Sequence, residues 1–376
     1  MSRPAAKGWC PGAYRPMMSG DGLVVRIRPV FGRMTRDQVI GLCDLSQRFG
    51  SGVIDLTSRA NVQIRGVSER DHETLLEALN ALDLLPDDPD LEARRNILLP
   101  FDWRTGDASH VIAQNLMSRL HELPNLPAKF GVAIDAGPAP ILTKASADIR
   151  VETADTGLIL RADGAATGKP VTVDSAVDAI VDLAKWFAGH ATGELRRMKS
   201  LIATQELASD WQQVAPRATR IKDTPGPHAC GQILGAPFGQ IAAKALRDLI
   251  ETSGATALRT TPWRLFLLED AVPCETSDFI TFADDPRLTV DACPGAPMCK
   301  SASVQTRDLA SSLAGLTTKR IHISGCSKGC ARARPSDLTL VGRDSMFDLV
   351  KDGHAWDAPF LSGLSPDDLK TRIGEF

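Results

Sequence analysis

The sequence predicts an α+β fold made of two similar half-modules related by an internal pseudo-twofold axis, each followed by an additional α/β block. Three observations support this prediction. A strand, helix, strand, strand pattern opens the chain and recurs about 204 residues later, and further helix and strand patterns follow each copy. In addition, 376 residues exceed the length of one ordinary domain.

The first copy begins with a strand pattern and continues with an amphipathic helix and two more strands. The predicted ranges are 23–29, 35–49, 52–58 and 61–67. Thr35 and Gln38 have the spacing of a capping box, and Val39 and Leu42 begin the apolar face of the helix. Cys43 falls on the same face, so we expect it to be a core residue.

The second copy repeats these features at residues 237–270. Phe31–Gly32 of the first copy corresponds to Phe238–Gly239, and Thr57 corresponds to Thr261. A unit that occurs twice in one chain predicts two modules that face each other across a pseudo-twofold axis.

Domain boundaries follow from this repeat and from the positions of proline and glycine. Residues 208–231 contain three prolines, which is typical of a linker. Helical patterns at 108–123 and 174–187 lie between the first copy and this linker. The predicted parts are a first half-module (1–85), a first block (90–205), the linker (208–231), a second half-module (232–288) and a C-terminal cysteine block (289–376).

Composition excludes several classes of function. Lys and Arg are spread along a chain of net charge -3, so no basic stripe indicates nucleic-acid binding. No apolar run approaches the roughly 18 residues needed to span a bilayer, so we expect a cytoplasmic protein without a membrane partner. The 8 cysteines are expected to be reduced, and clustered ones indicate metal or redox chemistry.

The strongest chemical signal is a pair of cysteine motifs in the cysteine block. Cys293 and Cys299 form C-x5-C, and Cys326 and Cys330 form C-x3-C. Proline and glycine keep both loops irregular, so that N–H groups can point toward sulfur and stabilise a negatively charged cluster. Four thiolates on two turns therefore indicate one iron–sulfur cluster. The alternatives are a structural zinc site, for which C-x5-C is wide, and unrelated buried thiols.

These motifs, placed after a duplicated α+β half, resemble the sulfite and nitrite reductases that carry siroheme and a 4Fe-4S cluster. The resemblance covers nearly the whole chain. It implies ferredoxin-like half-modules, a 4Fe-4S cluster on the four cysteines, and blocks that bind a tetrapyrrole. Three motifs resemble tetrapyrrole-contacting segments of that family: TSRANVQ with Arg59, RRN with Arg95, and LPAKF with Lys129.

Arginine is frequent on or beside the predicted strands. A tetrapyrrole with peripheral carboxylates favours guanidinium groups, because these bind carboxylates bidentately. Any one of these arginines alone is equally compatible with a solvated surface residue, but as a set they favour a polyanionic ligand. Arg264 is therefore a fourth predicted substrate-binding residue. The set consists of Arg26, Arg28, Arg59, Arg65, Arg95 and Arg264.

The sequence departs from the reductases at Gly131, where those enzymes have a second lysine two residues after the first, and its final block is short. A branch of oxygen-dependent enzymes in aerobic cobalamin biosynthesis is more similar. Resemblance to that branch implies a monooxygenase that hydroxylates precorrin-3A, a chemical relative of siroheme, at C20 and closes a lactone. It rests on four segments: 7–29, 234–241, 258–264 and 324–342.

The same resemblance implies dioxygen as a substrate and a second iron, which would be non-heme in a hydroxylase and siroheme in a reductase. The sequence shows no 2-His-1-carboxylate pattern among its 7 histidines. His228, beside Cys230, is the least explained histidine, and it is either a metal ligand or an ordinary loop histidine. The N-terminal loop, rich in glycine and proline, offers Cys10, Tyr14 and Asp21 as further candidates.

No glycine-rich dinucleotide fingerprint follows a predicted strand, so we expect electrons from an external donor, NADH or a reductase. Two other functions remain open: a siroheme-dependent reductase of sulfite or nitrite, and a non-catalytic iron–sulfur or tetrapyrrole carrier. Gly131 and the short final block disfavour the reductase. The duplicated scaffold is larger than an electron carrier needs.

Overall fold

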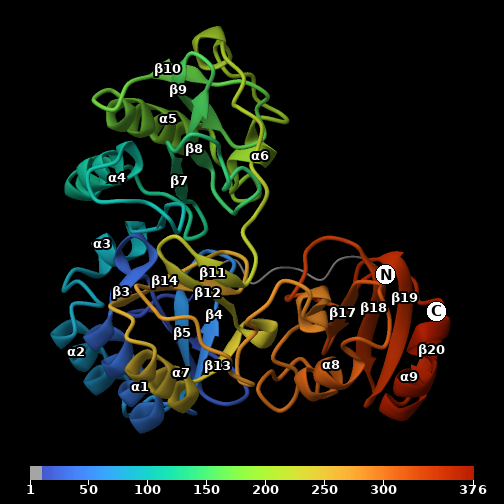
Figure 1. Cartoon of the computed structure of the whole chain (residues 1–376). Coiled ribbons are helices and arrows are strands. Elements are labelled where there is room, and N and C mark those ends of the chain that lie inside the picture. The colour runs from blue at the N-terminus through green and yellow to red at the C-terminus, as the bar shows by residue number, and fades with distance from the viewer. Residues whose placement is uncertain (1–10) are drawn as a thin grey trace.

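The computed structural model describes residues 11–376 and contains four five-stranded sheets. Two sheets form the half-modules at the base of Figure 1, the third lies above them in the first block, and the fourth lies beside them in the cysteine block. No helix among the described residues is long and apolar enough to cross a membrane.

The first half-module has the predicted strand, helix, strand, strand order, and its sheet order is β1-β2-β5-β4-β13. Its own elements are β1 (Met17–Met18), β2 (Leu23–Ile27), α1 (Arg36–Phe49), β4 (Val53–Leu56), β5 (Val62–Val67) and α2 (His72–Ala81). The predicted capping box is present, because the Thr35 side chain accepts from the Gln38 N–H and the Gln38 side chain accepts from the Thr35 N–H. Cys43 is fully buried, which confirms its place in the core.

The second half-module repeats this arrangement, with the sheet order β11-β12-β15-β14-β3. Its elements are β11 (Gly226–His228), β12 (Gly231–Gly235), α7 (Ala243–Thr252), β14 (Ala257–Thr260) and β15 (Leu265–Glu269). The turn Val30–Gly32 (η1) matches Pro237–Gly239 (η4), and Phe31 and Phe238 have positive φ values of 52° and 55°. This agreement supports the predicted correspondence of the two segments.

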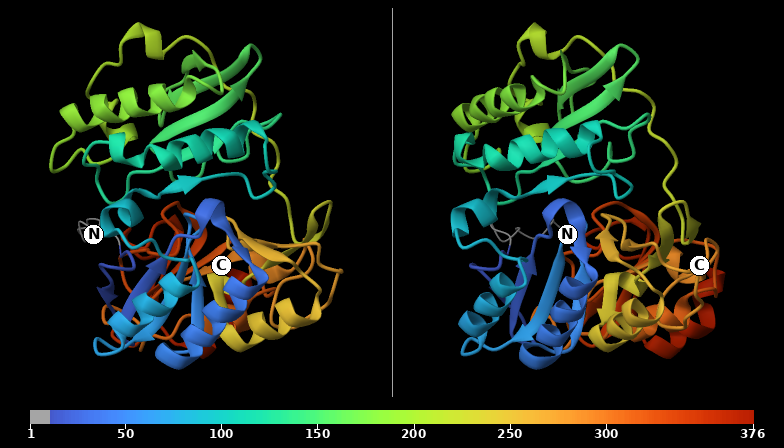
Figure 2. Two further views of the ribbon diagram at one scale, coloured as in Figure 1. Left: turned by 90° about the vertical axis from the view of Figure 1, so that its left-hand side faces the viewer. Right: turned by 60° about the vertical axis from the view of Figure 1, so that its left-hand side comes forward.

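The halves exchange one strand each. β3 (Arg33–Thr35), from the first copy, pairs with β14 in the second sheet, and β13 (Gln240–Ala242), from the second copy, pairs with β4 in the first sheet. The exchange is reciprocal, as a pseudo-twofold axis requires. Helices α1, α2 and α7 lie on the same side of the two sheets (Figure 2), and α1 and α7 share one apolar core through Leu42 and Leu246.

The first block has the sheet order β10-β9-β8-β7-β6, with α4 and α5 packed on it through residues such as Ile112 and Phe187. The two predicted helices are present as α4, followed by a short turn, and as α5. The elements are α3 (Pro89–Arg94), β6 (Ile97–Leu98), α4 (Ala108–Ser118), η2 (Leu120–Glu122), β7 (Val132–Asp135), β8 (Ile149–Ala154), β9 (Gly157–Ala162), β10 (Lys169–Val171), α5 (Ala176–His190) and α6 (Met198–Leu201).

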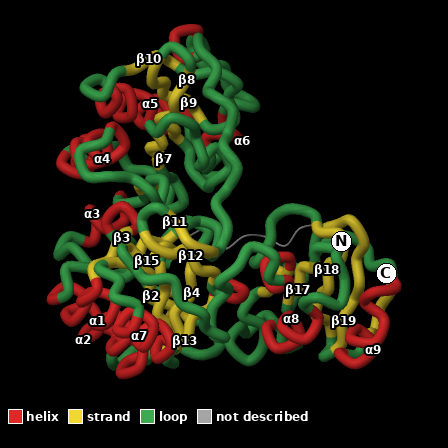
Figure 3. Tube along the Cα trace, viewed as in Figure 1, coloured by secondary structure: helices red, strands yellow, loops and turns green. Residues whose placement is uncertain are grey.

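A long connection returns the chain from α6 to the half-modules and is mostly loop in Figure 3, apart from the short turn η3 (Ser209–Trp211). It differs from the predicted linker 208–231 at its end. Gly226–His228 forms β11, an antiparallel edge strand on β12. Proline is tolerated at a sheet edge, which is why Pro227 does not prevent this pairing.

The cysteine block contains the sheet β16-β17-β18-β19-β20, in which β16, β17 and β18 run parallel. Its elements are η5 (Pro286–Thr289), β16 (Val290–Ala292), α8 (Arg307–Leu313), β17 (Ile321–Ser324), β18 (Ser336–Arg343), β19 (Met346–Gly353), β20 (Leu361–Leu364), α9 (Pro366–Arg372) and η6 (Ile373–Glu375). The second cysteine motif lies between β17 and β18.

Candidate metal centre and basic cavity

The two cysteine motifs lie at one edge of the C-terminal sheet. Cys293 directly follows β16, and Cys326 lies two residues beyond β17. These strands are parallel neighbours, with Ala292 opposite Ile323, so their carboxyl ends meet at the same edge. The Gly325 N–H donates to Cys293 Sγ at 3.1 Å and joins the two loops.

The four cysteine thiols influence one another electrostatically. Cys330 is exposed at the residue level, and its pKa is raised to about 11, first by partial desolvation of its thiol in the loop and then by Cys293, Cys326 and Cys299. Burial also raises the pKa of Cys326. Iron would therefore displace protons from these groups on binding. Within residues 11–376, no three His, Cys, Asp or Glu side chains converge tightly enough for a single metal ion, whereas a cluster distributes four thiolates over several irons.

Glycines allow the backbones of the cysteine loops to pack closely. A Cβ at Gly295 would lie 2.6 Å from Thr306 Oγ1, and one at Gly325 would lie 2.5 Å from the Ala302 Cβ. The Thr306 hydroxyl also donates to the Cys293 carbonyl. The loops are therefore held in a fixed arrangement that offers four thiols and at least one N–H donor to sulfur, which is the donor set of an iron–sulfur cluster.

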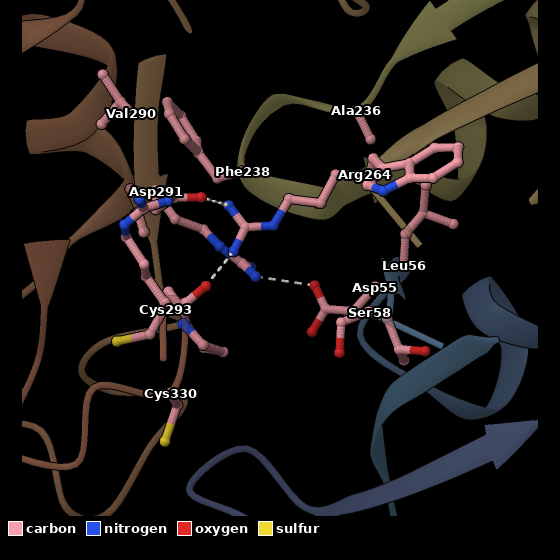
Figure 4. A pocket seen from close by; sticks show the side chains of 18 of the residues that line it. Asp55, Leu56, Ser58, Ala236, Phe238, Arg264, Val290, Asp291, Cys293 and Cys330 are labelled. Atoms are coloured by element: carbon pink, nitrogen blue, oxygen red, sulfur yellow. Dashed lines mark hydrogen bonds and ion pairs between the residues drawn. The ribbon is translucent and has the colours of Figure 1, made fainter. Parts of the chain in front are cut away.

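A cavity of about 770 Å³ lies where the two half-modules and the cysteine block meet. Cys293 and Cys330 line one side of it, and Asp55 lies on the opposite side (Figure 4). Basic side chains outnumber acidic ones in the lining, which favours a ligand with several negative charges. The basic residues are Arg26, Arg65, Lys222, Arg264, Arg287, Arg307, Arg320 and Arg332, and the acidic residues are Asp55 and Asp291.

Asp291 organises one wall of this cavity. Its carboxylate accepts from Arg264 Nη1 at 2.9 Å, from Arg332 Nη1 at 3.2 Å and from Arg320 Nη1 at 3.4 Å. Arg264 extends toward Asp291 in Figure 4 and also donates to the Ala331 carbonyl at 2.8 Å. Because one carboxylate serves three guanidinium groups, positive charge remains for a ligand.

Arg307 has hydrogen-bond donors that the protein leaves unused. Its Nη2 donates to Asp55 Oδ1 at 2.9 Å. Its Nε and Nη1 are buried and have no partner among the described residues. A buried donor without a partner is unfavourable by about 1–3 kcal/mol, so an anionic ligand in the cavity would gain by satisfying it. The residues present therefore fit a bound polycarboxylate.

Known proteins share this architecture. Residues 15–82 match the nitrite/sulfite reductase ferredoxin-like half domain. The NirA protein of Mycobacterium tuberculosis has the same fold, with a TM-score of 0.64 over 93% of this chain and 79% of that chain, at 17% identity. A ferredoxin–nitrite reductase of Leptolyngbya laminosa is 23% identical and aligns with 92% of this chain and 81% of its own length.

A precorrin-3B synthase of Sinorhizobium sp is 30% identical over 396 residues, which cover 93% of this chain and 83% of that protein. The chain belongs to the precorrin-3B synthase family. This assignment confirms the predicted resemblance and the α+β fold of the sulfite/nitrite reductase superfamily, and it makes the chain an oxidoreductase. An iron–sulfur cluster and siroheme are cofactors within that superfamily.

Three site residues predicted for this precorrin-3B synthase homologue line the cavity: Arg264, Cys293 and Cys330. Arg264 has a positive φ of 62°, which is unusual for a residue with a side chain and is a feature of functional sites. Burial lowers the pKa of Arg264, and Asp291 opposes that shift. Its guanidinium is thus positioned beside the cysteine loops by both backbone and side-chain contacts.

The other predicted tetrapyrrole contacts do not line this cavity in the part of the chain that the structure describes. Arg59 Nη2 donates to Ser146 Oγ at 3.1 Å, toward the first block. Arg95 Nη2 donates to the Arg28 carbonyl at 2.9 Å, and burial lowers the pKa of Arg95. Lys129 is partly buried in the turn before β7. The assignment of Arg59, Arg95 and Lys129 to a tetrapyrrole stays a prediction.

Gly131, where the reductases have a second lysine, has no room for a side chain. A Cβ at this position would lie 2.5 Å from Asn96 Nδ2, which donates to the Phe130 carbonyl at 2.7 Å. A lysine would have to displace this amide. In this precorrin-3B synthase homologue, the packing around Gly131 therefore leaves no space for the second lysine of the reductases.

Five basic cavity residues were missed from the sequence. Arg320 and Arg332 flank the second cysteine motif, so closeness to that motif is the signal that could have indicated them. Lys222 lies in the predicted linker, and Arg287 and Arg307 resemble ordinary surface charges in the sequence. Only the folded structure shows that these five residues line one cavity, because they come together where the modules pack against each other.

The remaining candidates for the second iron do not form a ligand set within residues 11–376. His228 Nδ1 accepts from the Cys230 N–H at 3.2 Å, and both residues line a smaller cavity of about 380 Å³ next to the first block. Tyr14 donates to the Pro86 carbonyl at 2.6 Å. Asp21 pairs with Arg65. Cys10 lies outside the described residues.

Proposed function

We propose that this chain catalyses the oxygen-dependent conversion of precorrin-3A to precorrin-3B in aerobic cobalamin biosynthesis. The observation that carries the proposal is the basic cavity beside the cysteine loops, in a chain whose relative is named precorrin-3B synthase. The reaction would hydroxylate C20 of the macrocycle and close a lactone from a ring acetate.

The cavity residues would bind and orient the macrocycle. A volume of about 770 Å³ lies within the range of small-molecule sites, about 300–1,000 Å³. Arg264, Arg307 and Arg320 would face peripheral carboxylates, because each has a guanidinium in the lining. Arg59, Arg95 and Lys129 are proposed contacts on the basis of the family resemblance. Fixed carboxylates would hold C20 and the reacting acetate in one orientation.

We assign a 4Fe-4S cluster to Cys293, Cys299, Cys326 and Cys330, and such a cluster would supply single electrons for oxygen chemistry. The donor set and the N–H that Gly325 directs at Cys293 Sγ support this assignment. A second iron, non-heme in a hydroxylase, is part of the proposal. Its ligands are not assigned.

The proposed reaction balances with an external donor of two electrons, either NADH or a reductase. One atom of dioxygen enters the new C20–O bond, and the other leaves as water after taking up two electrons and two protons. The lactone oxygen comes from the acetate already on the ring. The chain itself needs no dinucleotide site if a partner delivers the electrons.

Isotope labelling and substrate-dependent oxygen consumption test this proposal. Given a reductant, the protein is expected to consume dioxygen only when precorrin-3A is present, and labelled dioxygen should place one labelled atom in the product hydroxyl. Reduced viologen should not be oxidised with sulfite or nitrite. Label arriving from water would exclude a monooxygenase, and rapid sulfite or nitrite turnover would favour the siroheme-dependent reductase instead. If both activities are absent while the metal complement is intact, the result would favour a carrier.

A further inference from the structure

The N-terminal turn Ser19–Gly22 lies against the first cysteine loop. It is a tight turn, in which the Ser19 N–H donates to the Gly22 carbonyl at 2.8 Å, and it leads directly into β2. It contacts the cysteine loop at Met298, the residue before Cys299. The turn lies within residues 7–29, one of the four segments that resemble the family in sequence, and none of its residues lines the cavity.

Three donors from the first half-module converge on the Met298 carbonyl. Ser19 Oγ donates at 2.6 Å, the Gly20 N–H at 3.0 Å and Arg65 Nη2 at 3.2 Å. A carbonyl oxygen has two lone pairs and most often serves one or two donors. All three donors are more than 230 residues away from Met298 in the sequence, so this contact ties two modules together at one atom.

Gly20 shows how closely the two backbones approach. A Cβ at this position would lie 2.2 Å from the Pro297 carbonyl oxygen and 3.1 Å from the Cys299 nitrogen. Both atoms belong to backbone, which cannot rotate away as a flexible side chain would. Only glycine therefore allows the turn to reach Met298.

Arg65 is held in place from its other side. Its Nε and Nη2 bind Asp21 at 3.0 and 3.1 Å, and its Nη1 binds Asp55 at 3.3 Å. Its side chain is 6% exposed, so these contacts are shielded from solvent. Asp55 in turn binds Arg307 in the cavity wall. The contact at Met298 is thus connected to the ligand cavity through charged groups.

We propose that Ser19, Gly20 and Arg65 are positioning residues for the cluster, which fix the 293–299 loop at Met298 and set the electrostatics beside Cys299. This inference rests on the proposed 4Fe-4S cluster. The negative end of the Met298 carbonyl dipole lies one residue from a cluster ligand, and its three donors neutralise part of that charge. Reduction adds negative charge to a cluster, so these donors favour the reduced form and raise the reduction potential.

Two substitutions test the proposal. Ser19→Ala removes one donor and leaves the backbone free to keep its path, whereas Gly20→Ala forces the two backbones apart. Gly189→Ala is the matched control, because a Cβ there meets nothing within 4 Å. Each protein would be purified without oxygen, and its iron, acid-labile sulfide, reduction potential and electron paramagnetic resonance spectrum would be measured. Cluster decay in air would be followed as well.

Ser19→Ala is expected to keep the cluster, to shift its potential to more negative values and to shorten its lifetime in air several-fold. Gly20→Ala is expected to lose most of its iron and sulfide, and Gly189→Ala to match the wild type. If Gly20→Ala does not fold, Ser19→Ala still decides the matter. A Ser19→Ala protein with wild-type potential, spectrum and air stability would overturn the positioning role alone. A wild-type protein that holds no cluster would overturn the positioning role together with the proposed cofactor.

Discussion

Arg307→Met is the most direct test of the cavity as a carboxylate site. The substitution removes the two buried donors that have no partner, and it removes the ion pair with Asp55. Asp55 retains its ion pair with Arg65 Nη1 at 3.3 Å. A hydrogen bond to a charged group contributes about 1.5–3 kcal/mol, and about 1.4 kcal/mol corresponds to a factor of ten. Tetrapyrrole binding should therefore weaken about 10- to 150-fold. The free energy of unfolding should change little, because losing the Asp55 contact and removing unsatisfied donors act in opposite directions.

Fluorescence titration with uroporphyrin, a tetrapyrrole with an acetate and a propionate on each ring, would measure the affinity. Arg217→Met is the matched control, because Arg217 pairs with Asp155 on the surface and does not line the cavity. Arg307→Lys keeps the charge and should bind with intermediate affinity. Equal affinity of Arg307→Met and the wild type would refute the assignment of the cavity.

Three further predictions concern the cluster, the mapped contacts and pH. Cys326→Ser and Cys330→Ser should each lose the cluster and the activity while the chain stays folded; full iron and acid-labile sulfide in either variant would contradict this. Arg59→Ala and Arg95→Ala should each weaken uroporphyrin binding by about 1.5–3 kcal/mol, and unchanged affinity in both would show that the mapping is wrong. Burial lowers the pKa of His322 to about 4, so the unfolded chain takes up this proton first as the pH falls. Its contribution to stability is complete above about pH 6.5 and is lost toward about pH 4, by about 3 kcal/mol. Urea unfolding of His322→Leu should show a flatter pH dependence, and an identical dependence would rule out this role.

Local patterns in the sequence predicted much of the fold. The capping box of α1 involves two residues three positions apart, and the predicted α1, β4 and β5 follow one another directly along the chain. Such features depend on neighbouring residues, so the sequence alone reveals them. The cavity depends on Arg307, Asp55 and Arg264, which come from three different parts of the chain. Nothing near any one of them in the sequence indicates the others.

The sequence also could not show what packs against each of the two halves. Strand register makes Asp55 and Arg65 of the first half equivalent to Arg259 and Glu269 of the second, and both pairs form ion pairs of opposite polarity. In the second half, Arg259 donates to the Phe101 carbonyl at 3.0 Å, so the first block occupies the equivalent position. The difference lies in what packs on each half, and the repeat itself does not encode it.

The reciprocal exchange of β3 and β13 has a consequence for how the chain is made. Residue 53 of β4 pairs with residue 242 of β13, its partner from the other half. Because these residues are far apart in the chain, β4 leaves the ribosome long before β13. At about 5–20 residues per second, the outer edge of β4 waits about 10–40 s for its neighbour. An unpaired strand edge is a template for aggregation. We therefore expect the exposed edge of β4 in the nascent first half to be covered by a chaperone or by other parts of the new chain until β13 is made. A truncated first half should aggregate unless the missing strand is supplied as a peptide.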